Sequence, residues 1–230
     1  MKKNPSFIFL LLIIISFNGY SQFIIDKVDP SNSGALFRNP LLNNSDSAII
    51  EGSQYINKEF NLAEISGTSQ KLLVRYNAFT DMIEVQNEKK ELFSLPKNDP
   101  FNIITIAPFS NKIKLLKYKT KERVENGYLV ELYNQNQFSL YRRDRVIFQK
   151  EKEASSSYSV AIPARYVEAS DEYYLSLKNE TAVMMPKNKK EMLLLFPEKA
   201  DEITNYLKKN DFSIKDETSV LNMVRFLAGS

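Results

Sequence analysis

The sequence predicts a mainly β fold of the α+β class: an antiparallel sandwich or open barrel of about ten short strands, followed by two or three short C-terminal helices. Between residues 54 and 186, short segments alternate between apolar and polar residues, which is the period of a half-buried strand. Turn residues separate these segments, and after Pro186 the spacing of apolar residues becomes helical. We therefore expect a β-rich domain over residues 54–186 and helices packed on its sheet over residues 187–230.

The chain begins with the three parts of a secretory signal peptide. Lys2 and Lys3 precede an apolar run over residues 7–17, and Gly19-Tyr20-Ser21 supplies small residues at a cleavage site. The run of eleven residues is too short to cross a bilayer, which needs about 20 apolar residues. We expect residues 1–21 to be a signal peptide cleaved after Ser21, and we expect no transmembrane helix after processing.

The segment over residues 22–53 is rich in Asn, Ser, Asp and Pro and shows no sustained period. This composition predicts a flexible N-terminal arm. The strands expected after the arm are short and apolar on one face at least. They cover residues 60–65, 72–76, 82–86, 91–95, 101–106, 112–119, 128–133, 137–142, 145–148, 158–162, 173–177 and 181–185.

Two hairpins stand out among these strands. Residues 77–81 connect the strand before them to the strand at 82–86, and residues 134–136 connect the strands at 128–133 and 137–142. We expect a turn at Glu125-Asn126-Gly127 before the second hairpin and an exposed loop over residues 150–157, which read KEKEASSS.

The helices are predicted from their start signals. Asn188 followed by Glu191 forms a capping-box pattern, Pro197 suits a first helical turn, and Asp216 is a second cap. The simplest interpretation is that these helices cover one face of the sheet. Met192 and Met223 also allow an interpretation as an adaptable docking element.

Composition excludes most catalytic chemistry that depends on particular side chains. The chain has 0 His and 0 Cys, so it lacks Ser-His-Asp triads, thiol nucleophiles, disulfides and the common zinc sites. It has 6 Gly, none grouped into a nucleotide-binding loop. Asn43-Asn44-Ser45-Asp46 lacks the spacing of a calcium loop. We predict no cofactor and no metal site.

The charges do not predict a nucleic-acid partner. The chain has 31 Lys and Arg against 28 Asp and Glu, and removal of the leader takes away Lys2 and Lys3. The densest basic segment is Tyr141-Arg142-Arg143-Asp144-Arg145, which we interpret as a solvated strand end rather than an anion-binding patch. The expected partner is an envelope protein or a glycan.

Two sets of candidate site residues remain. Glu84 and Glu131 lie in predicted strands with apolar neighbours and are weak candidates for a pair of catalytic carboxylates; the alternative is that both point to solvent. Tyrosines at strand positions are candidates for a sugar- or peptide-binding face, with cross-strand packing as the alternative. They are Tyr128, Tyr133, Tyr141, Tyr173 and Tyr174.

Three stretches carry a resemblance to a known group. They are Gly52-Ser53-x-Tyr55-Ile56-Asn57-x-x-Phe60, Leu73-Val74-Arg75-Tyr76-Asn77-x-x-Thr80-Asp81-x-Ile83-Glu84, and Lys189-Lys190-x-x-Leu193-Leu194-Leu195-Phe196-Pro197 with its continuation to Asn210. Together they resemble a family of small exported envelope proteins of Bacteroidota that has no assigned activity. The resemblance implies export and a β-then-helix layout, and it implies no catalytic residue.

We therefore expect an exported, non-enzymatic envelope protein with a binding or scaffolding role, located in the periplasm or at the outer membrane. One alternative is a carboxylate-based hydrolase acting on envelope polysaccharide. The other is a carbohydrate- or peptide-recognition module that uses a tyrosine-rich sheet face.

Overall fold

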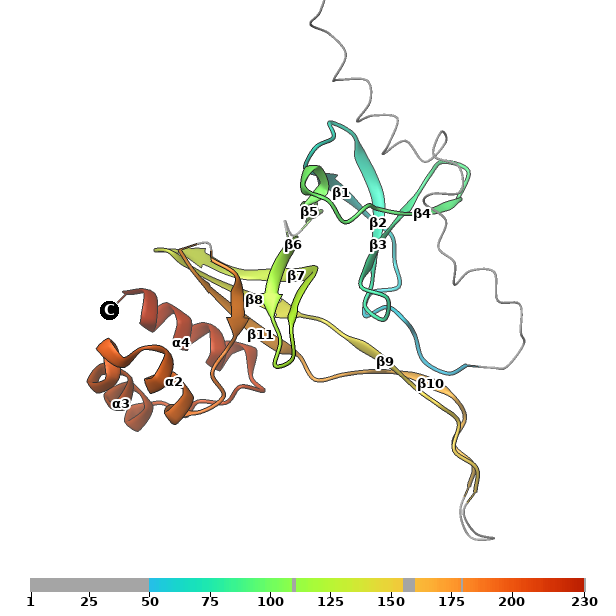
Figure 1. Cartoon of the computed structure of the whole chain (residues 1–230). Helices are drawn as coiled ribbons and strands as arrows, with labels where there is room; N and C mark the ends of the chain where they lie inside the picture. The colour runs from blue at the N-terminus through green and yellow to red at the C-terminus, as the bar shows by residue number, and fades with distance from the viewer. Residues whose placement is uncertain (1–49, 109–110, 155–159, 179, 230) are drawn as a thin grey trace, which may run out of the picture.

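The computed structural model describes residues 50–108, 111–154, 160–178 and 180–229. Within these residues the chain forms twelve strands followed by three C-terminal α-helices (Figure 1). The mainly β, α+β class predicted from the sequence is confirmed, and five of the strands close into a barrel. The expected signal peptide and most of the expected arm lie outside the described residues.

The first five strands, called the first sheet below, pair antiparallel in the order β4-β3-β2-β1-β5. Through β5, which pairs with β6 (Asn111–Lys119), they are continuous with the barrel strands in one ten-stranded sheet. The residues of these strands alternate between apolar and polar or form short apolar runs, which is typical of strands with one or both faces buried. The hairpin predicted between the second and third strands is present. The elements are β1 (Asn61–Ile65), β2 (Lys71–Asn77), β3 (Met82–Gln86), β4 (Leu92–Ser94), the 3-10 helix η3 (Asp99–Phe101) and β5 (Ile103–Ile106).

The barrel is a meander whose last strand returns to the first. Its strands are β6 (Asn111–Lys119), β7 (Val124–Gln135), β8 (Phe138–Arg143), β11 (Glu172–Leu177) and β12 (Ala182–Met184). Neighbours along the meander are antiparallel, so with an odd number of strands the first and last must run in the same direction. The closing pair is indeed parallel, with Ala182 opposite Tyr118 and Val183 opposite Lys119.

The barrel interior is filled by buried side chains from every strand. They are Tyr118 (β6), Leu129 (β7), Tyr141 (β8), Tyr174 (β11) and Ala182 (β12). The rings of Tyr118 and Tyr174 meet edge to face, with centroids 4.8 Å apart. A five-stranded barrel is narrow, so a few large side chains leave a packed core rather than a channel.

Two layers cover the outside of the barrel. Tyr128 and Val130 of β7 point away from the interior and pack on Ile83 and Val85 of the first sheet. On the other side, Leu140 and its neighbours pack against the C-terminal helices. The helical layer consists of α2 (Lys189–Leu195), the 3-10 helix η4 (Pro197–Lys199), α3 (Ala200–Lys209) and α4 (Glu217–Gly229). The sheet, barrel and helices therefore form consecutive layers (Figure 1).

The predicted helix starts are confirmed. The Asn188 side chain accepts a hydrogen bond from the backbone N–H of Glu191 at 3.0 Å, and Asp216 accepts one from Thr218 at 3.0 Å. Glu191 accepts from the backbone N–H of Lys187 at 2.8 Å, one residue before the cap residue that a standard capping box would use.

A two-stranded ribbon projects between β8 and β11, away from the three layers (Figure 1). It pairs β9 (Val146–Gln149) with β10 (Arg165–Glu168), and Phe148 lies opposite Tyr166. Farther out, the backbones of Lys152 and Ile162 exchange two hydrogen bonds of 2.9 Å. Residues 150–154 are exposed, as expected of the loop predicted over residues 150–157, although Lys152 bridges to the returning chain. Residues 155–159 lie outside the described residues, and the described part of the strand expected over 158–162 forms only this bridge.

Two other expectations are wrong. β7 runs through the turn predicted at Glu125-Asn126-Gly127, and the chain instead turns at Thr120, whose N–H bonds the carbonyl of Arg123 at 2.8 Å. The described end of the expected arm is attached rather than free, because Glu51 forms a parallel bridge to Arg165. Its N–H donates to Ala164, and its carbonyl accepts from Tyr166.

Candidate functional site

Glu84 lies in the middle of β3, and its side chain has 0 % exposed surface. Ile83 and Val85 on either side point into the core of the first sheet, so Glu84 points to the opposite face. Residues of the segment before β1 cover that face. A charged group in such a position requires partners that replace its lost water.

Three side chains bind the Glu84 carboxylate. Arg75 of β2 donates from Nη2 at 2.7 Å, Asn77 donates from Nδ2 at 3.1 Å, and the Tyr55 hydroxyl donates to the two oxygens at 2.9 and 3.0 Å. Burial, together with the charge of Glu84 and its hydrogen bond, raises the pKa of Tyr55 to about 12. The arrangement anchors the segment over residues 50–60 to the sheet.

Two aromatic rings and a backbone carbonyl also contact the Arg75 guanidinium. Its guanidinium carbon lies 3.7 Å from the ring centroid of Tyr55 and 4.4 Å from that of Phe60. Its Nη1 donates to the carbonyl of Lys58 at 3.0 Å. The Glu84 carboxylate is therefore ion-paired and buried. The alternative that Glu84 points to solvent is wrong, and its weak candidacy as a catalytic carboxylate stays a prediction.

Glu131 lies on β7, beside a bulge between Glu131 and Tyr133. It forms an ion pair with Lys114 of β6, and Asn134 donates to it at 3.2 Å. Both carboxylates proposed from the sequence are thus committed to positively charged neighbours on adjacent strands. Glu131 is also not the solvent-facing residue of the alternative interpretation, since its side chain has 10 % exposed surface.

The tyrosine-rich binding face expected from the sequence is also corrected. Tyr128, Tyr141, Tyr173 and Tyr174 are buried, and Tyr133 is half-buried against the helical layer. They point to three different cores, because successive strand residues alternate between faces and both faces of this barrel are covered. The alternative interpretation, packing within the sheet, describes them.

The arginines of the basic segment are paired with acids at one end of the barrel. Arg142 binds Asp144 and Glu217, Arg143 binds Glu125 and Glu172, and Arg145 binds Glu172. Tyr118 and Tyr174 donate their hydroxyls to Glu125 and Glu172, respectively, at 2.9 and 3.0 Å. The segment closes the barrel with compensated charge and is neither a bare solvated strand end nor a free anion-binding patch.

A feature that sequence reasoning missed is the aromatic cluster at the base of the ribbon. The Tyr166 ring lies 5.1 Å from that of Phe79 and 5.3 Å from that of Phe148, measured between centroids. Phe79 and Phe148 are exposed, and Gln54 donates to the Tyr166 hydroxyl at 2.9 Å. The signal available in the sequence was the pair of aromatic segments on either side of a serine-rich stretch.

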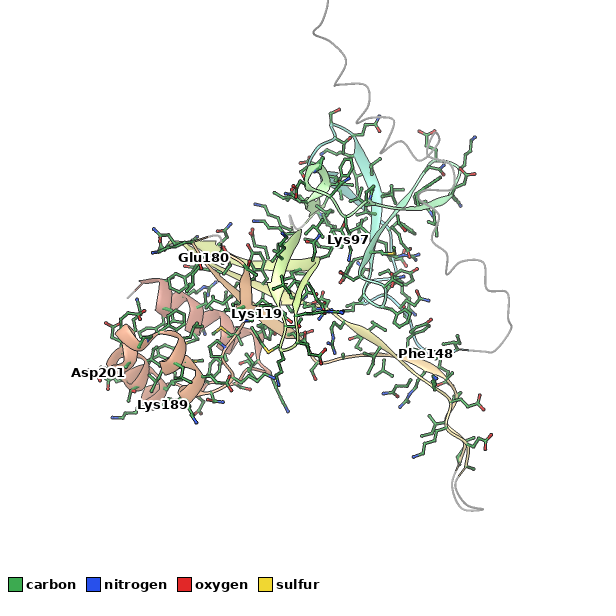
Figure 2. All side chains as sticks on the ribbon, in the orientation of Figure 1. Lys97, Lys119, Phe148, Glu180, Lys189 and Asp201 are labelled. Carbon is green, nitrogen blue, oxygen red and sulfur yellow. The ribbon has the colours of Figure 1, made fainter. Side chains whose placement is uncertain are left out.

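The ribbon concentrates the exposed apolar surface of the described residues. Six of the eleven exposed large apolar side chains lie on it or at its base: Ile50, Phe79, Ile147, Phe148, Val160 and Ile162. Val160 is 86 % exposed. We call these six residues the ribbon surface. Figure 2 labels Phe148, which lies well away from the helical layer.

Two negative findings limit the chemistry of the described residues. They contain no group of three acidic side chains placed to hold a metal ion. None of their helices is long and apolar enough to span a bilayer. The Asn43–Asp46 cluster considered for calcium lies outside the residues that the structure describes.

Comparison with known proteins identifies no relative. A scan against models of protein families finds no match, and searches of curated proteins and of solved structures find none either.

Proposed function

We propose that this chain is an exported, non-enzymatic binding or scaffolding protein of the cell envelope, and that the ribbon surface is its contact with another envelope protein. The observation that carries the proposal is the concentration of exposed apolar side chains on a projecting two-stranded element. Contiguous exposed apolar surface marks interaction sites in soluble proteins.

The architecture of the ribbon supports this role. A two-stranded ribbon is only marginally stable in water, because it needs a third strand or a covering layer to bury its apolar side chains. The base of this ribbon has such support: Glu51 bonds the outer edge of β10, and Ala78 accepts from the backbone N–H of Val146 in β9. Beyond that base, Val160 and Ile162 lack a covering element among the described residues. A partner protein would supply it.

Site-specific photo-crosslinking in the native envelope tests the proposal. A photoreactive amino acid replaces Val160 or Ile162 in one set of strains, and Leu73 in a control strain. Leu73 is an exposed apolar residue on β2, far from the ribbon in the fold. We expect one discrete adduct from the ribbon positions and none from Leu73. No adduct at any position, or the same adducts at all three, would overturn the proposal.

The aromatic cluster favours a second candidate function, carbohydrate recognition. Two exposed phenylalanines beside a tyrosine offer apolar ring faces with an adjacent polar tip, which suits stacking on a sugar. Titration of soluble envelope glycan fragments, followed by NMR of the aromatic protons, would show saturable shifts that Phe148→Ser abolishes. Absence of shifts in the unmodified protein excludes this candidate.

A further inference from the structure

We propose that the protein docks on an anionic lipid bilayer through a basic surface that is separate from the ribbon. We call it the lysine surface. It consists of Lys117, Lys119, Lys121, Lys187, Lys189 and Lys190, together with Leu194. The inference goes beyond the proposed function and does not depend on it, because no residue of the ribbon takes part.

Two of the six lysines, Lys117 and Lys119, lie on the outer face of β6, and Lys121 lies in the turn that follows the strand. Alternate residues of this strand point away from the barrel interior, where Tyr118 is buried. Ile113 and Leu115 on the outer face are covered by the first sheet. Lys117 and Lys119 continue the same face beyond that cover and are exposed to solvent.

The other three lysines lie at the start of the helical layer: Lys189 and Lys190 belong to α2, and Lys187 precedes its cap residue Asn188. Val183 of β12 lies opposite Lys119 in the parallel pair, and Lys187 follows four residues later, which is at most about 13 Å of extended chain. Electrostatics agree with this placement. The backbone hydrogen bond from Lys187 lowers the pKa of Glu191 in α2, and the charge of Lys121 lowers it further.

The six lysines are not neutralised within the fold. Among the described residues, none of them has a carboxylate within 4.0 Å, whereas Lys71, Lys97 and Lys114 each do. The acids in the same segments are Glu122 and Glu191. Both oxygens of Glu191 accept hydrogen bonds at the start of α2. The surface therefore keeps a net positive charge and complements an anionic partner.

The lysine surface also has an apolar component, which lies on α2. A hollow of about 480 Å³ is lined by Lys189, Lys190, Leu193 and Leu194, and Leu194 is 74 % exposed. All four residues belong to α2, so no second element faces them across the hollow. Such an open site does not enclose a peptide side chain. It fits a planar counterpart that offers phosphates to the lysines and an acyl boundary to Leu194. Figure 2 labels Lys119 on the barrel and Lys189 on the helical layer.

Vesicle sedimentation tests the proposal with the processed protein, purified after export so that the leader is absent. One set of vesicles contains phosphatidylcholine alone, and the other contains about one third phosphatidylglycerol. We expect binding to the anionic vesicles that weakens as salt is added. The double variant Lys119→Glu with Lys190→Glu should lower the partition coefficient at least tenfold.

The matched control is Lys58→Glu with Lys89→Glu, which changes the net charge equally at two exposed lysines outside the lysine surface. It should keep most of the binding. Leu194→Ser should weaken binding several-fold and leave its salt dependence unchanged. Circular dichroism confirms that each variant is folded.

Three outcomes would overturn the inference. The first is equal binding to neutral and anionic vesicles. The second is an equal loss in both double variants, which would show a general charge effect. The third is binding to soluble dextran sulfate without binding to anionic vesicles, which would assign the surface to an acidic polymer instead.

Discussion

The Nη2 of Arg75 lies 2.7 Å from Oε2 of Glu84, across the hairpin of β2 and β3, where the two residues are directly opposed. The Glu84 side chain has 0 % exposed surface and that of Arg75 has 15 %. This pair, with Tyr55 above it, fastens the segment before β1 to the sheet. Removing Arg75 would take the ion-pair partner from a carboxylate whose side chain has no exposed surface, and loss of one member of a buried ion pair is strongly destabilising.

Arg75→Ala is therefore expected to lower the free energy of unfolding by about 3–5 kcal/mol, measured by urea denaturation. In the double variant with Glu84→Ala, the second substitution should cost much less than it does alone, because the stranded charge is gone. Additive losses in the double-mutant cycle would contradict this. Lys71→Ala is the matched control, because its pair with Glu64 is exposed; its denaturation midpoint should not change measurably.

Gly127 is expected to tolerate no side chain. A Cβ placed there would lie 2.6 Å from Oδ2 of Asp81 and 3.1 Å from the Tyr118 ring. Asp81 cannot easily move, because it holds Lys97, the Tyr76 hydroxyl and the backbone N–H of Tyr128. Gly127→Ala should thus cost about 1–3 kcal/mol in thermal or urea unfolding. Gly229→Ala is the control, since a Cβ there meets nothing within 4 Å.

Alkaline pH is expected to unfold the protein as buried tyrosines ionise. Burial is the main cause that raises the pKa of Tyr55, Tyr173 and Tyr174 to about 12, and it also raises the pKa of Tyr76, Tyr118 and Tyr128. A raised folded-state pKa contributes stability that is full below about pH 10, the pKa of unfolded tyrosine, and is lost above it.

Stability should therefore decline between about pH 10 and 12. Absorbance of tyrosinate and far-UV circular dichroism, recorded on the same samples, check this. The ionisation of these tyrosines should coincide with the loss of circular dichroism. Complete ionisation of all tyrosines at pH 10 in a folded protein would contradict it. Tyr55→Phe should reduce by one the number of tyrosines that ionise together with unfolding.

Asn188→Ala is expected to destabilise α2 by about 1 kcal/mol, because the side chain satisfies the backbone N–H of Glu191. Asn188→Asp retains an acceptor oxygen and should restore stability. The measurement is the midpoint of urea unfolding. Equal midpoints for the Ala and Asp variants would show that the cap contributes nothing.

The features predicted correctly from the sequence are the local ones. The β2–β3 hairpin and the Asn188 cap depend on residues a few positions apart, so the sequence contains their determinants. The order of strands followed by helices could be predicted for the same reason, because the spacing of apolar residues within each segment indicates a strand or a helix.

The positions of the site residues could not be predicted, because they depend on pairings between distant segments. Glu84 binds Tyr55, which lies 29 positions earlier in the chain, in a stretch for which the sequence predicts no strand or helix. Tyr174 enters the barrel because β12 closes onto β6, and no local pattern specifies a parallel pair. The same closure assembles the lysine surface from two segments far apart in the chain. The sequence does not predict the ribbon, because β10 has only 4 residues and β9, with which it pairs, precedes a charged stretch.

The parallel seam between β6 and β12 is only two residue pairs long, whereas β6 and β7 share seven. Hydrogen-bonded ladders open most readily where they are shortest and least regular. Separation of β6 from β12 would open the barrel, while every antiparallel pair of neighbouring barrel strands kept its hydrogen bonds. Amide exchange should then be fastest at Ala182 and Val183 among the barrel strands.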